Sequence, residues 1–454
     1  MPLLQPDHAL DVCRSLVDAS PADETEVRLE CTEENFVRFD QRGPTQNGDR
    51  ERYHLAIRVR VSTKAGLQEA RAACGSLDPD DGRAALERAM LLAQVAGPIE
   101  NAQPLGGAVT VAETAAQRPT RDHTFREKAS WIAQAQETCA RDGLLPAGLA
   151  QTGAHSQTLV NSAGRAVHGS TSRAHWALTA FRGGEAGAGA MASCTHPNVE
   201  RLDVEGTIAQ AVDRAIRSHG PVDYAPQETT VVLMPPAAAS LLAFAANHGL
   251  GAQEFSERNS FLCDRVGQPL FPADLRILDD AANELCPGLP FDGEGWPRER
   301  FTLLEAGCLQ GPVTDDRWSR LMGVPNSGHG KSQPSSAGPA PTNLVVGAGD
   351  ASVEQLIAGV EDGLMVSDLH YTNMIEPRDL TLTGMTRGGT FRIQGGRLGQ
   401  PVRNLRFTMS LVNVLRRVSG IGSEQLVNRP TNCPEIISPA LRVERFRFTS
   451  ATDF

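Results

Sequence analysis

The side chains that could carry out hydrolytic chemistry are a few scattered histidines and carboxylates. Zinc peptidases hold their metal with neutral imidazole or thiolate donors, and a nearby carboxylate accepts a proton from the metal-bound water. The segment 241–250 reads Leu-Leu-Ala-Phe-Ala-Ala-Asn-His-Gly-Leu and contains one such donor, His248. Nowhere in the sequence are two histidines separated by two, three or four residues, so the usual helical ligand pair is absent. Metal binding by His248 would need partners from far along the chain, and Cys433 is one candidate.

Four carboxylates follow one another at Asp279, Asp280, Asp292 and Glu294. Paired acids can act as general acid and base in hydrolysis, and clustered carboxylates can bind a hard metal ion. However, Asp292 and Glu294 alternate with glycines, a composition typical of tight turns in which carboxylates accept backbone hydrogen bonds. We therefore expect a turn here, with binding of a peptide amine or arginine at a dimer cleft as the alternative.

A serine and a histidine occur together in Asn-Ser-Gly-His-Gly, residues 326–330. Ser327 and His329 could form part of a serine-hydrolase site, but the sequence indicates no third group that would orient the imidazole. The glycines favour instead a close approach of the backbone to a bound peptide. We expect residues 326–342, rich in Ser, Pro and Gly, to be a mobile loop.

The helix that carries His248 is predicted from the local pattern. Residues 228–234 form a short apolar run typical of a buried strand, and the pair at 235–236 is proline, which is accepted in the first turn of a helix. Gly249 can supply a left-handed residue that ends the helix. Phe244 and His248 share one helical face, which predicts Phe244 in the core and His248 at the helix end or facing a partner.

Length and composition limit the class of protein. At 454 residues the chain exceeds a usual single core, so two domains are expected. A net charge of −11 opposes nucleic-acid binding, and no apolar run approaches the roughly 20 residues of a membrane helix. The first residues lack a basic region ahead of an apolar one, which favours a cytoplasmic location. The nine cysteines are dispersed without a C-x-x-C pair, which indicates free thiols.

Helical and strand patterns alternate in both halves. Residues 1–225 are predicted to form an α+β domain in which helices pack on an antiparallel sheet. Residues 226–454 are predicted to form a strand-rich domain with a few helices. The helices expected in the first domain are 7–20, 80–96, 121–141 and 204–218, and the expected short strands are 26–31, 35–40, 53–62 and several within 148–194.

Several phrases of the second half occur in the order found in one protein family. They are Leu-Leu at 241–242 with His-Gly-Leu at 248–250, Asn-Ser-Phe-Leu at 259–262, Asp-Asp at 279–280, Phe-Asp-Gly-Glu-Gly at 291–295, Leu-Glu-Ala-Gly-Cys-Leu at 304–309, Asn-Ser-Gly-His-Gly at 326–330 and Gly-Leu-Met-Val at 363–366. On these phrases the chain resembles the TldD/PmbA family. In that family's zinc helix a leucine pair precedes His-Glu, three residues, and a second His followed by Gly-Leu. The resemblance aligns His248 with the second histidine, Ala243 with the first, and Phe244 with the glutamate.

The family contains TldD-type chains, which carry the His-Glu-x-x-x-His zinc helix, and PmbA-type chains, also called TldE, which lack it and assemble with the first into a metallopeptidase. The resemblance implies the second type: a subunit without a cofactor of its own, in a heterodimer with a zinc-bearing TldD-like chain. Such a subunit would bind peptide substrate by adding it as a strand to an exposed sheet edge. The candidate substrate-binding residues are Asp292, Glu294, Ser327 and His329.

Two alternatives remain open. The chain could be a self-sufficient peptidase whose non-standard metal site includes His248 and Cys433, which predicts stoichiometric zinc in the isolated chain. It could instead be a homodimeric peptide-binding modulator without proteolysis, and co-purification with a second, His-Glu-containing chain would argue against this.

Overall fold

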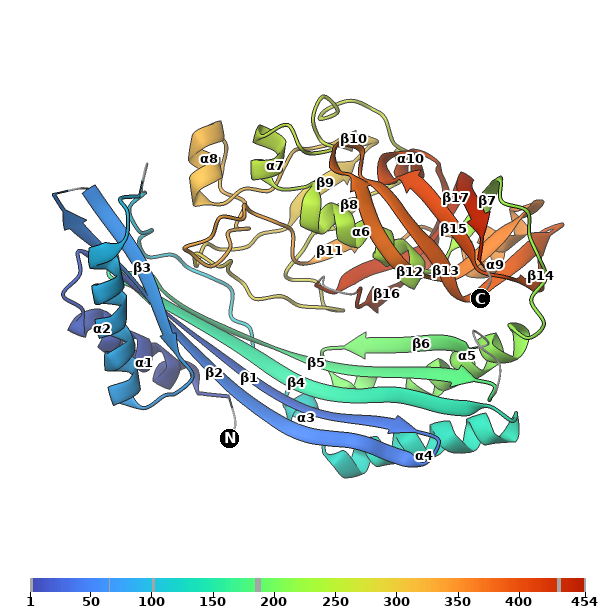
Figure 1. Ribbon diagram of the computed structural model, residues 1–454, viewed down its shortest axis with the longest axis horizontal. Coiled ribbons are helices and arrows are strands. Elements are labelled where there is room, and N and C mark those ends of the chain that lie inside the picture. The colour runs from blue at the N-terminus through green and yellow to red at the C-terminus, as the bar shows by residue number, and fades with distance from the viewer. Residues whose placement is uncertain (1–2, 65, 100–102, 184–188, 431–433, 453–454) are drawn as a thin grey trace.

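A six-stranded antiparallel sheet, sheet A, forms the first half of the molecule, in the order β3-β2-β1-β4-β5-β6 (Figure 1). The computed structural model describes residues 3–64, 66–99, 103–183, 189–430 and 434–452. The strands of sheet A are β1 (Glu24–Asp40), β2 (Gly43–Thr63), β3 (Gly66–Cys74), β4 (Leu145–Asn161), β5 (Ala166–Phe181) and β6 (Gly189–His196).

Sheet A has an apolar face covered by helices and a polar face turned toward the rest of the chain. Successive side chains of a strand point to opposite faces. Accordingly, Val27 and Val37 of β1 lie in the helix-covered cores, whereas Glu26, Phe36 and Arg38 line cavities on the opposite side. Figure 1 shows α4 below the sheet and the second domain above it.

Three of the helices that cover sheet A begin after residues whose side chains cap them. Asp78, Thr124 and Asp203 each accept a hydrogen bond from a backbone N–H in the first helical turn, which satisfies a donor that the helix itself cannot pair. The helices of this half are α1 (Pro6–Ala19), α2 (Pro79–Val95), α3 (Arg118–Arg121), α4 (Phe125–Arg141) and α5 (Val204–Arg217), with a 3-10 turn at Val199–Arg201.

The second half builds an eleven-stranded mixed sheet, sheet B, five strands of which close into a ring. In the ring β7 pairs with β12, β12 with β13, β13 with β15, β15 with β17, and β17 again with β7. The ring strands are β7 (Glu228–Leu233), β12 (Asp362–Glu376), β13 (Thr381–Gln394), β15 (Leu405–Ser410) and β17 (Ile436–Ala451). The others are β8 (Ile277–Asp279), β9 (Phe301–Glu305), β10 (Cys308–Leu309), β11 (Leu344–Val346), β14 (Arg397–Val402) and β16 (Val418–Asn428).

Helix α6 (Pro235–His248) follows β7 directly and packs against β12 and β17. A helix that is apolar around most of its circumference must be buried, and α6 forms part of the main core of the second domain. Its buried residues are Pro235, Ala237, Ala238, Ala239, Leu241, Leu242, Ala243, Ala245 and Ala246. The shorter helices of this half are α7 (Ala252–Ser256), α8 (Asp316–Met322), α9 (Val353–Ala358) and α10 (Leu411–Arg416), with a 3-10 turn at Pro377–Asp379.

The predicted α+β class, with helices on an antiparallel sheet followed by a strand-rich half, is confirmed. The expected strand lengths were wrong, because residues 26–31 and 35–40 belong to one strand, β1, and β2 runs through Gly48 without a break. Between these two runs, Glu34 lines a cavity between the sheets, whereas Glu33 lies on the opposite face and pairs with Arg121 of α3. The helix expected at 121–141 is divided into α3 and α4. None of the helices in the described residues has the length and apolar character needed to cross a membrane.

Candidate functional site

The helix positions that the family resemblance aligns with a zinc motif lie at three different depths in α6. Ala243 is only 5% exposed and sits in the main core. Phe244 is half-buried and packs against that core, as predicted. His248 is the last helical residue and is exposed, with its ring centroid 6.3 Å from that of Phe244. The three side chains therefore do not converge on one point.

Gly249 ends α6 for a reason other than the one predicted. Its φ is −155°, a negative value outside the left-handed region. A Cβ at this position would lie 2.6 Å from the ring of Phe261. Glycine is needed here because an aromatic side chain packs directly on the backbone, so the expectation of a left-handed helix end was wrong.

The side chains at the aligned positions do not fit a zinc ion. Alanine and phenylalanine have no donor atom, so only His248 could ligate. Among the described residues, no group of three or more His, Cys, Asp or Glu side chains is placed to hold a metal. Cys433, the other candidate ligand, lies outside the described residues.

The fold brings Ser327 and His329, which were predicted as a pair, together with Asp279, which was predicted separately. The Oγ of Ser327 lies 2.9 Å from Nδ1 of His329. On the other side of the ring, Nε2 lies 3.2 Å from Oδ1 of Asp279, in an ion-pair contact without good hydrogen-bond alignment. Asp279 also forms an ion pair of 2.5 Å with Arg298 and accepts a hydrogen bond from the backbone N–H of Asn343 at 2.8 Å. The order serine, histidine, aspartate resembles a hydrolase triad.

The bonding of Ser327 nevertheless indicates a structural role for this trio. Its Oγ donates to the carbonyl of Thr314 at 3.0 Å and accepts from the Thr314 N–H at 2.7 Å. A hydroxyl has one proton and cannot also give it to the imidazole. The amides that could form an oxyanion hole are bonded too, that of Ser327 to Thr314 and that of Gly328 to Asn326. The trio thus fastens the start of segment 326–342, where Gly328 and His329 are buried.

The electrostatics of Asp279 support this role. Burial alone would raise the pKa of Asp279, but the contacts with His329 and Arg298 outweigh it and hold that pKa well below its usual range. Asp280 next to it is buried and forms an ion pair of 2.7 Å with Arg300. The two aspartates therefore form ion pairs with two different arginines and do not form a catalytic acid pair.

Asp292 and Glu294 form the predicted turn. Asp292 accepts hydrogen bonds from the backbone N–H groups of Glu294, Trp296 and Gly330 at 2.7 to 2.9 Å. Glu294 accepts from the N–H of Asp316 at 3.1 Å. Burial, followed by the charge of Asp292, raises the pKa of Glu294 to about 8. Burial also raises the pKa of Asp292, to about 6.

This turn contacts sheet A through two buried arginines. Arg28 donates to the carbonyl of Gly293, and Arg165 donates to the carbonyl of Glu294 at 2.7 Å. The Arg165 guanidinium also lies 4.5 Å from the ring centroid of Trp296. Both arginines are at most 5% exposed. The turn that was expected to bind substrate is therefore built into the contact between the two halves.

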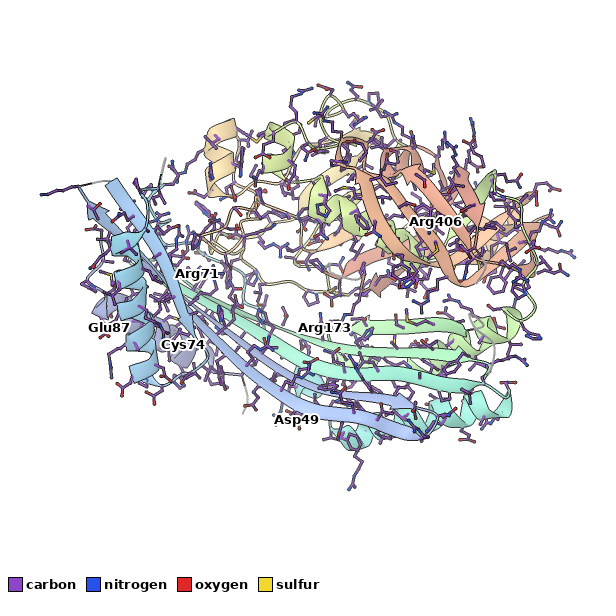
Figure 2. All side chains as sticks on the ribbon, in the orientation of Figure 1. Asp49, Arg71, Cys74, Glu87, Arg173 and Arg406 are labelled. Carbon is purple, nitrogen blue, oxygen red and sulfur yellow. The ribbon has the colours of Figure 1, made fainter. Side chains whose placement is uncertain are left out.

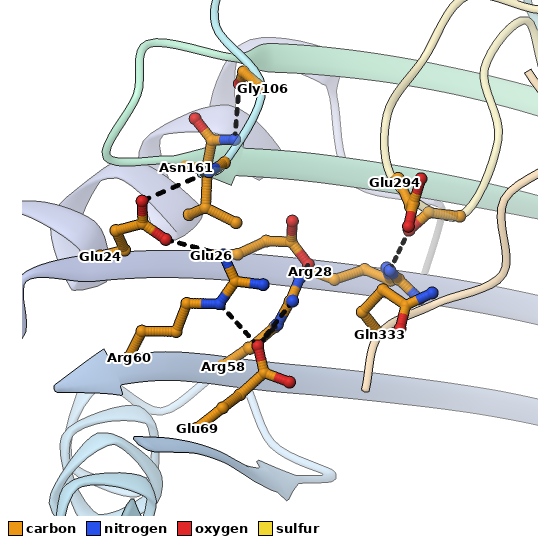
Figure 3. A network of polar contacts seen from close by, with 12 residues as sticks. Glu24, Glu26, Arg28, Arg58, Arg60, Glu69, Gly106, Asn161, Glu294 and Gln333 are labelled. Carbon is orange, nitrogen blue, oxygen red and sulfur yellow. Dashed lines mark hydrogen bonds and ion pairs between the residues drawn. The ribbon is translucent and has the colours of Figure 1, made fainter. Parts of the chain in front are cut away.

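Further buried arginines of sheet A lie near this contact and are paired with glutamates of the same sheet (Figure 3). Arg58 and Arg60 share Glu69, at 2.6 and 2.7 Å, and Arg60 also reaches Glu24 at 2.8 Å. Such pairs keep buried guanidinium groups compensated. Figure 3 shows these side chains on neighbouring strands, with Glu294 on the facing loop.

A cleft of about 920 Å³ lies between the polar face of sheet A and the second domain. Its floor comes from β1, β2, β4, β5 and the edge strand β6, and its roof from the first turns of α6, from β12 and β13, and from the end of β16. Pro236 and Ser240 are the α6 residues that line it. Figure 2 shows Arg173 on the side of sheet A that faces the second domain. None of the predicted substrate-binding residues lines this cleft.

Arginines from distant parts of the chain line the cleft, and sequence reasoning did not find them. They are Arg38, Arg50, Arg173, Arg387 and Arg429, opposite the carboxylates Glu34, Asp368 and Glu435. Strand alternation could have assigned Arg38 to the polar face of β1, but no local pattern joins it to Arg387. Burial, together with the charges of Arg429 and Arg173, lowers the pKa of His175 in the cleft floor to about 3.

Comparisons with known proteins point to one family. Residues 226–450 match the family described as the PmbA/TldA metallopeptidase C-terminal domain. A TldD homologue from Haemophilus influenzae, named as a metalloprotease, is 27% identical over 191 residues, 40% of this chain and 38% of that protein. Metalloprotease PmbA from Escherichia coli O157:H7 is 25% identical over 191 residues, 41% of this chain and 39% of that protein. These alignments therefore span about two fifths of the relatives' length.

One further relative and two solved structures match more of the chain. A metalloprotease from Methanothermobacter thermautotrophicus is 21% identical over 351 residues, 74% of this chain and 76% of that protein. TldE from Thermococcus kodakarensis has a TM-score of 0.83 at 18% identity, covering 98% of this chain and 99% of that one. A protein from Thermotoga maritima described as a putative modulator of a DNA gyrase has a TM-score of 0.82 at 17% identity, over 98% and 99% of the two chains. The same fold therefore extends over both halves.

Proposed function

This chain belongs to the TldD/PmbA family through residues 226–450, and from this membership we propose that it is a PmbA/TldE-type, non-catalytic subunit of a zinc metallopeptidase. A TldD-like partner would supply the zinc, its ligands and the general base. This chain would bind peptide substrate and complete the chamber in which the peptide is cut, either for proteolysis or for maturation of a peptide product.

The observation that carries the proposal is the chemistry of α6. At the positions aligned with the family's first histidine and glutamate stand Ala243, buried in the core, and Phe244, packed against it. These residues stabilise the helix and its packing but can neither bind a metal nor accept a proton from water. The loss of donor atoms in a helix that keeps its place in the fold is what a non-catalytic subunit requires.

The cleft beneath α6 supports the peptide-binding part of the proposal. β6 is the edge strand of sheet A, and its residues Met191 and Ser193 line the cleft. An extended peptide can pair with the backbone of such an edge while its side chains enter the space alongside. The cleft thus combines an adjoining volume with a sheet edge that pairs with no further strand in the described part of the chain, although β13 and β16 also lie close to β6.

The test is reconstitution with a TldD-type chain that carries the complete His-Glu-x-x-x-His motif. The two chains should co-purify, and the complex should cleave an unstructured peptide in a zinc-dependent manner. The isolated chain should neither cleave it nor bind one equivalent of zinc. A complex in which the motif glutamate of the TldD-type chain is changed to glutamine is the control, and it should assemble without activity.

Two results would overturn the proposal. Zinc-dependent peptidase activity of the isolated chain would show that it is self-sufficient, and loss of that activity in His248→Ala would then place His248 in the metal site. A homodimer that binds peptide but neither associates with a TldD-type chain nor stimulates its activity would favour the modulator without proteolysis.

A further inference from the structure

The cleft between the two domains is cationic in a protein that carries an overall charge of −11. Five arginines and three carboxylates line it, so the local balance is opposite in sign to that of the whole chain. Charges on the walls of a cleft act more strongly than the same charges on an open surface, because the low-dielectric walls focus their field. The cleft therefore attracts anions.

At the mouth of the cleft two arginines share one carboxylate. Arg173 forms an ion pair with Glu435, and Arg429 reaches the same Glu435 oxygen at 3.5 Å. Arg429 also donates to Gln151 Oε1 at 3.1 Å. Glu34 also acts on Arg429 but is itself paired with Arg50. These three arginines therefore face only two carboxylates, and the group keeps a net positive charge. Consistent with this crowding, burial and the charge of Arg173 lower the pKa of Arg429.

The remaining cleft arginines extend this positive region along the floor and the roof. Arg50 lies 3.5 Å from Glu34 on the floor and 4.3 Å from the ring centroid of Phe36. Arg38 lies on β1 beside them and is exposed. Arg387 on β13 lies opposite, with its guanidinium 3.2 Å from Nδ1 of His370. Arg38 and Arg387 thus present charge from both walls of the same space.

We propose that this cleft binds a carboxylate group carried by an extended peptide, so that the preferred peptides are acidic or end in a free carboxyl group within reach of the arginines. This rests on the proposed function, because it assigns a chemical class to the peptide of that site. Guanidinium groups bind planar carboxylates through two parallel hydrogen bonds. A strand added along β6 would place alternate side chains on the cleft side, next to Arg173 on β5. An extended peptide that continues from there across the floor of the cleft would carry its carboxylate toward Arg38 on β1, three strands away from β6.

The test compares four short fluorescent peptides of one sequence, using fluorescence anisotropy with the full chain alone and with its complex. One peptide is neutral with an amidated C-terminus, the second has a free C-terminal carboxylate, the third is amidated with internal aspartates, and the fourth is amidated with internal lysines. We expect the second or the third to bind about fivefold to tenfold more tightly than the first, the range for one or two partly exposed charge contacts. The tighter of the two identifies the source of the carboxylate. The preference should weaken as salt is raised.

A matched pair of double variants locates the effect. Arg38→Gln with Arg387→Gln should weaken binding of the carboxylate peptide by about tenfold and leave the neutral peptide within about twofold, as loss of two modest charge contacts requires. Arg83→Gln with Arg126→Gln removes the same charge from exposed positions on α2 and α4 and should leave both affinities unchanged.

The outcomes separate this inference from the proposed function. Equal affinity for all four peptides, together with zinc-dependent cleavage by the complex, would overturn the carboxylate site and leave the proposed function standing. Tighter binding of a single-stranded oligonucleotide than of the acidic peptide would also overturn it. Absence of cleavage by the complex, with the charge preference and its loss in the cleft variant still observed, would overturn the proposed function and retain the carboxylate site.

Discussion

Glu294 lies at the contact between the two halves and has a carboxyl group whose pKa is raised. Its backbone carbonyl accepts a hydrogen bond from buried Arg165, while its carboxylate accepts one N–H and faces the charges of Asp292 and Asp315. Burial and these neighbouring carboxylates disfavour the ionised form. The turn holds the Glu294 side chain in place, and the folded state loses stability as its carboxyl group ionises.

We predict that Glu294→Gln makes stability less sensitive to alkaline pH. An acid whose folded-state pKa is raised to about 8, compared with roughly 4.3 in the unfolded chain, stabilises the fold less and less as pH rises between these two values. Glutamine carries no such penalty. The melting temperature of the variant, relative to the unchanged protein, should therefore increase from pH 5 to pH 9.

The control for this prediction is Glu87→Gln, which neutralises an exposed glutamate on α2. Its melting temperature should differ from that of the unchanged protein by the same amount at every pH. A constant difference for Glu294→Gln as well would contradict the assignment of a raised pKa to Glu294.

At the scale of the element, α6 is a buried helix whose side chains serve packing. The alanines of α6 allow close packing against β12 and β17. At the end of the helix, Gly249 leaves room for the ring of Phe261 because it has no side chain. Two ligands five residues apart, as in the family's zinc motif, lie about 140° apart on an ideal helix. Substituting histidine at position 243 and glutamate at position 244 would therefore not by itself create a metal site.

We predict that Ala243→His with Phe244→Glu destabilises the protein without creating a zinc site. Ala243 is 5% exposed, so a histidine there would overpack the core, at a cost of about 1–3 kcal/mol. Urea unfolding would measure this loss, and metal analysis after dialysis against zinc would measure binding.

Asn247→His is the matched control, because it adds a histidine at an exposed position of the same helix. Its stability should change by no more than about 0.5 kcal/mol. One tightly bound zinc per chain in the double variant would show that α6 can adopt the geometry of a metal helix.

At the scale of the whole molecule, the two halves meet through polar contacts and one small apolar cluster. The large buried apolar clusters belong separately to the helix-covered face of sheet A and to the second domain. Leu159 and Val167 of sheet A form a smaller cluster with Phe291 of the turn. Beside it, Arg28 and Arg165 donate to the turn at 291–295. Because buried charges are stable only when they are compensated, these polar contacts contribute to how firmly the halves are joined.

We predict that Arg165→Met uncouples the unfolding of the two halves. The change removes hydrogen bonds to the carbonyls of Gly107 and Glu294. Gly107 is exposed, so water can replace its lost donor, whereas the partly buried Glu294 carbonyl loses its partner at a cost of about 1–3 kcal/mol. In calorimetry, the thermal unfolding transitions of the two halves should lie further apart in the variant than in the unchanged protein.

Arg320→Met serves as the control, since Arg320 is an exposed α8 residue paired with Asp316 on the same helix. It should change the unfolding profile little. An unaltered profile for Arg165→Met would mean that other contacts hold the halves together.

By itself the sequence determined the α+β class, helix α6 and the turn at Asp292 and Glu294, because these depend on local periodicity and on glycine and proline chemistry. It also determined the absence of ligand atoms at positions 243 and 244. The tertiary structure decided the rest. Tertiary folding placed Asp279 at the end of β8 against the loop residue His329, which in turn contacts Ser327, both about 50 residues further along the chain. It also gathered arginines of β1, β2, β5, β13 and the segment after β16 around one cleft. Such sites depend on which strands pair, and pairing between distant segments leaves no local pattern to read.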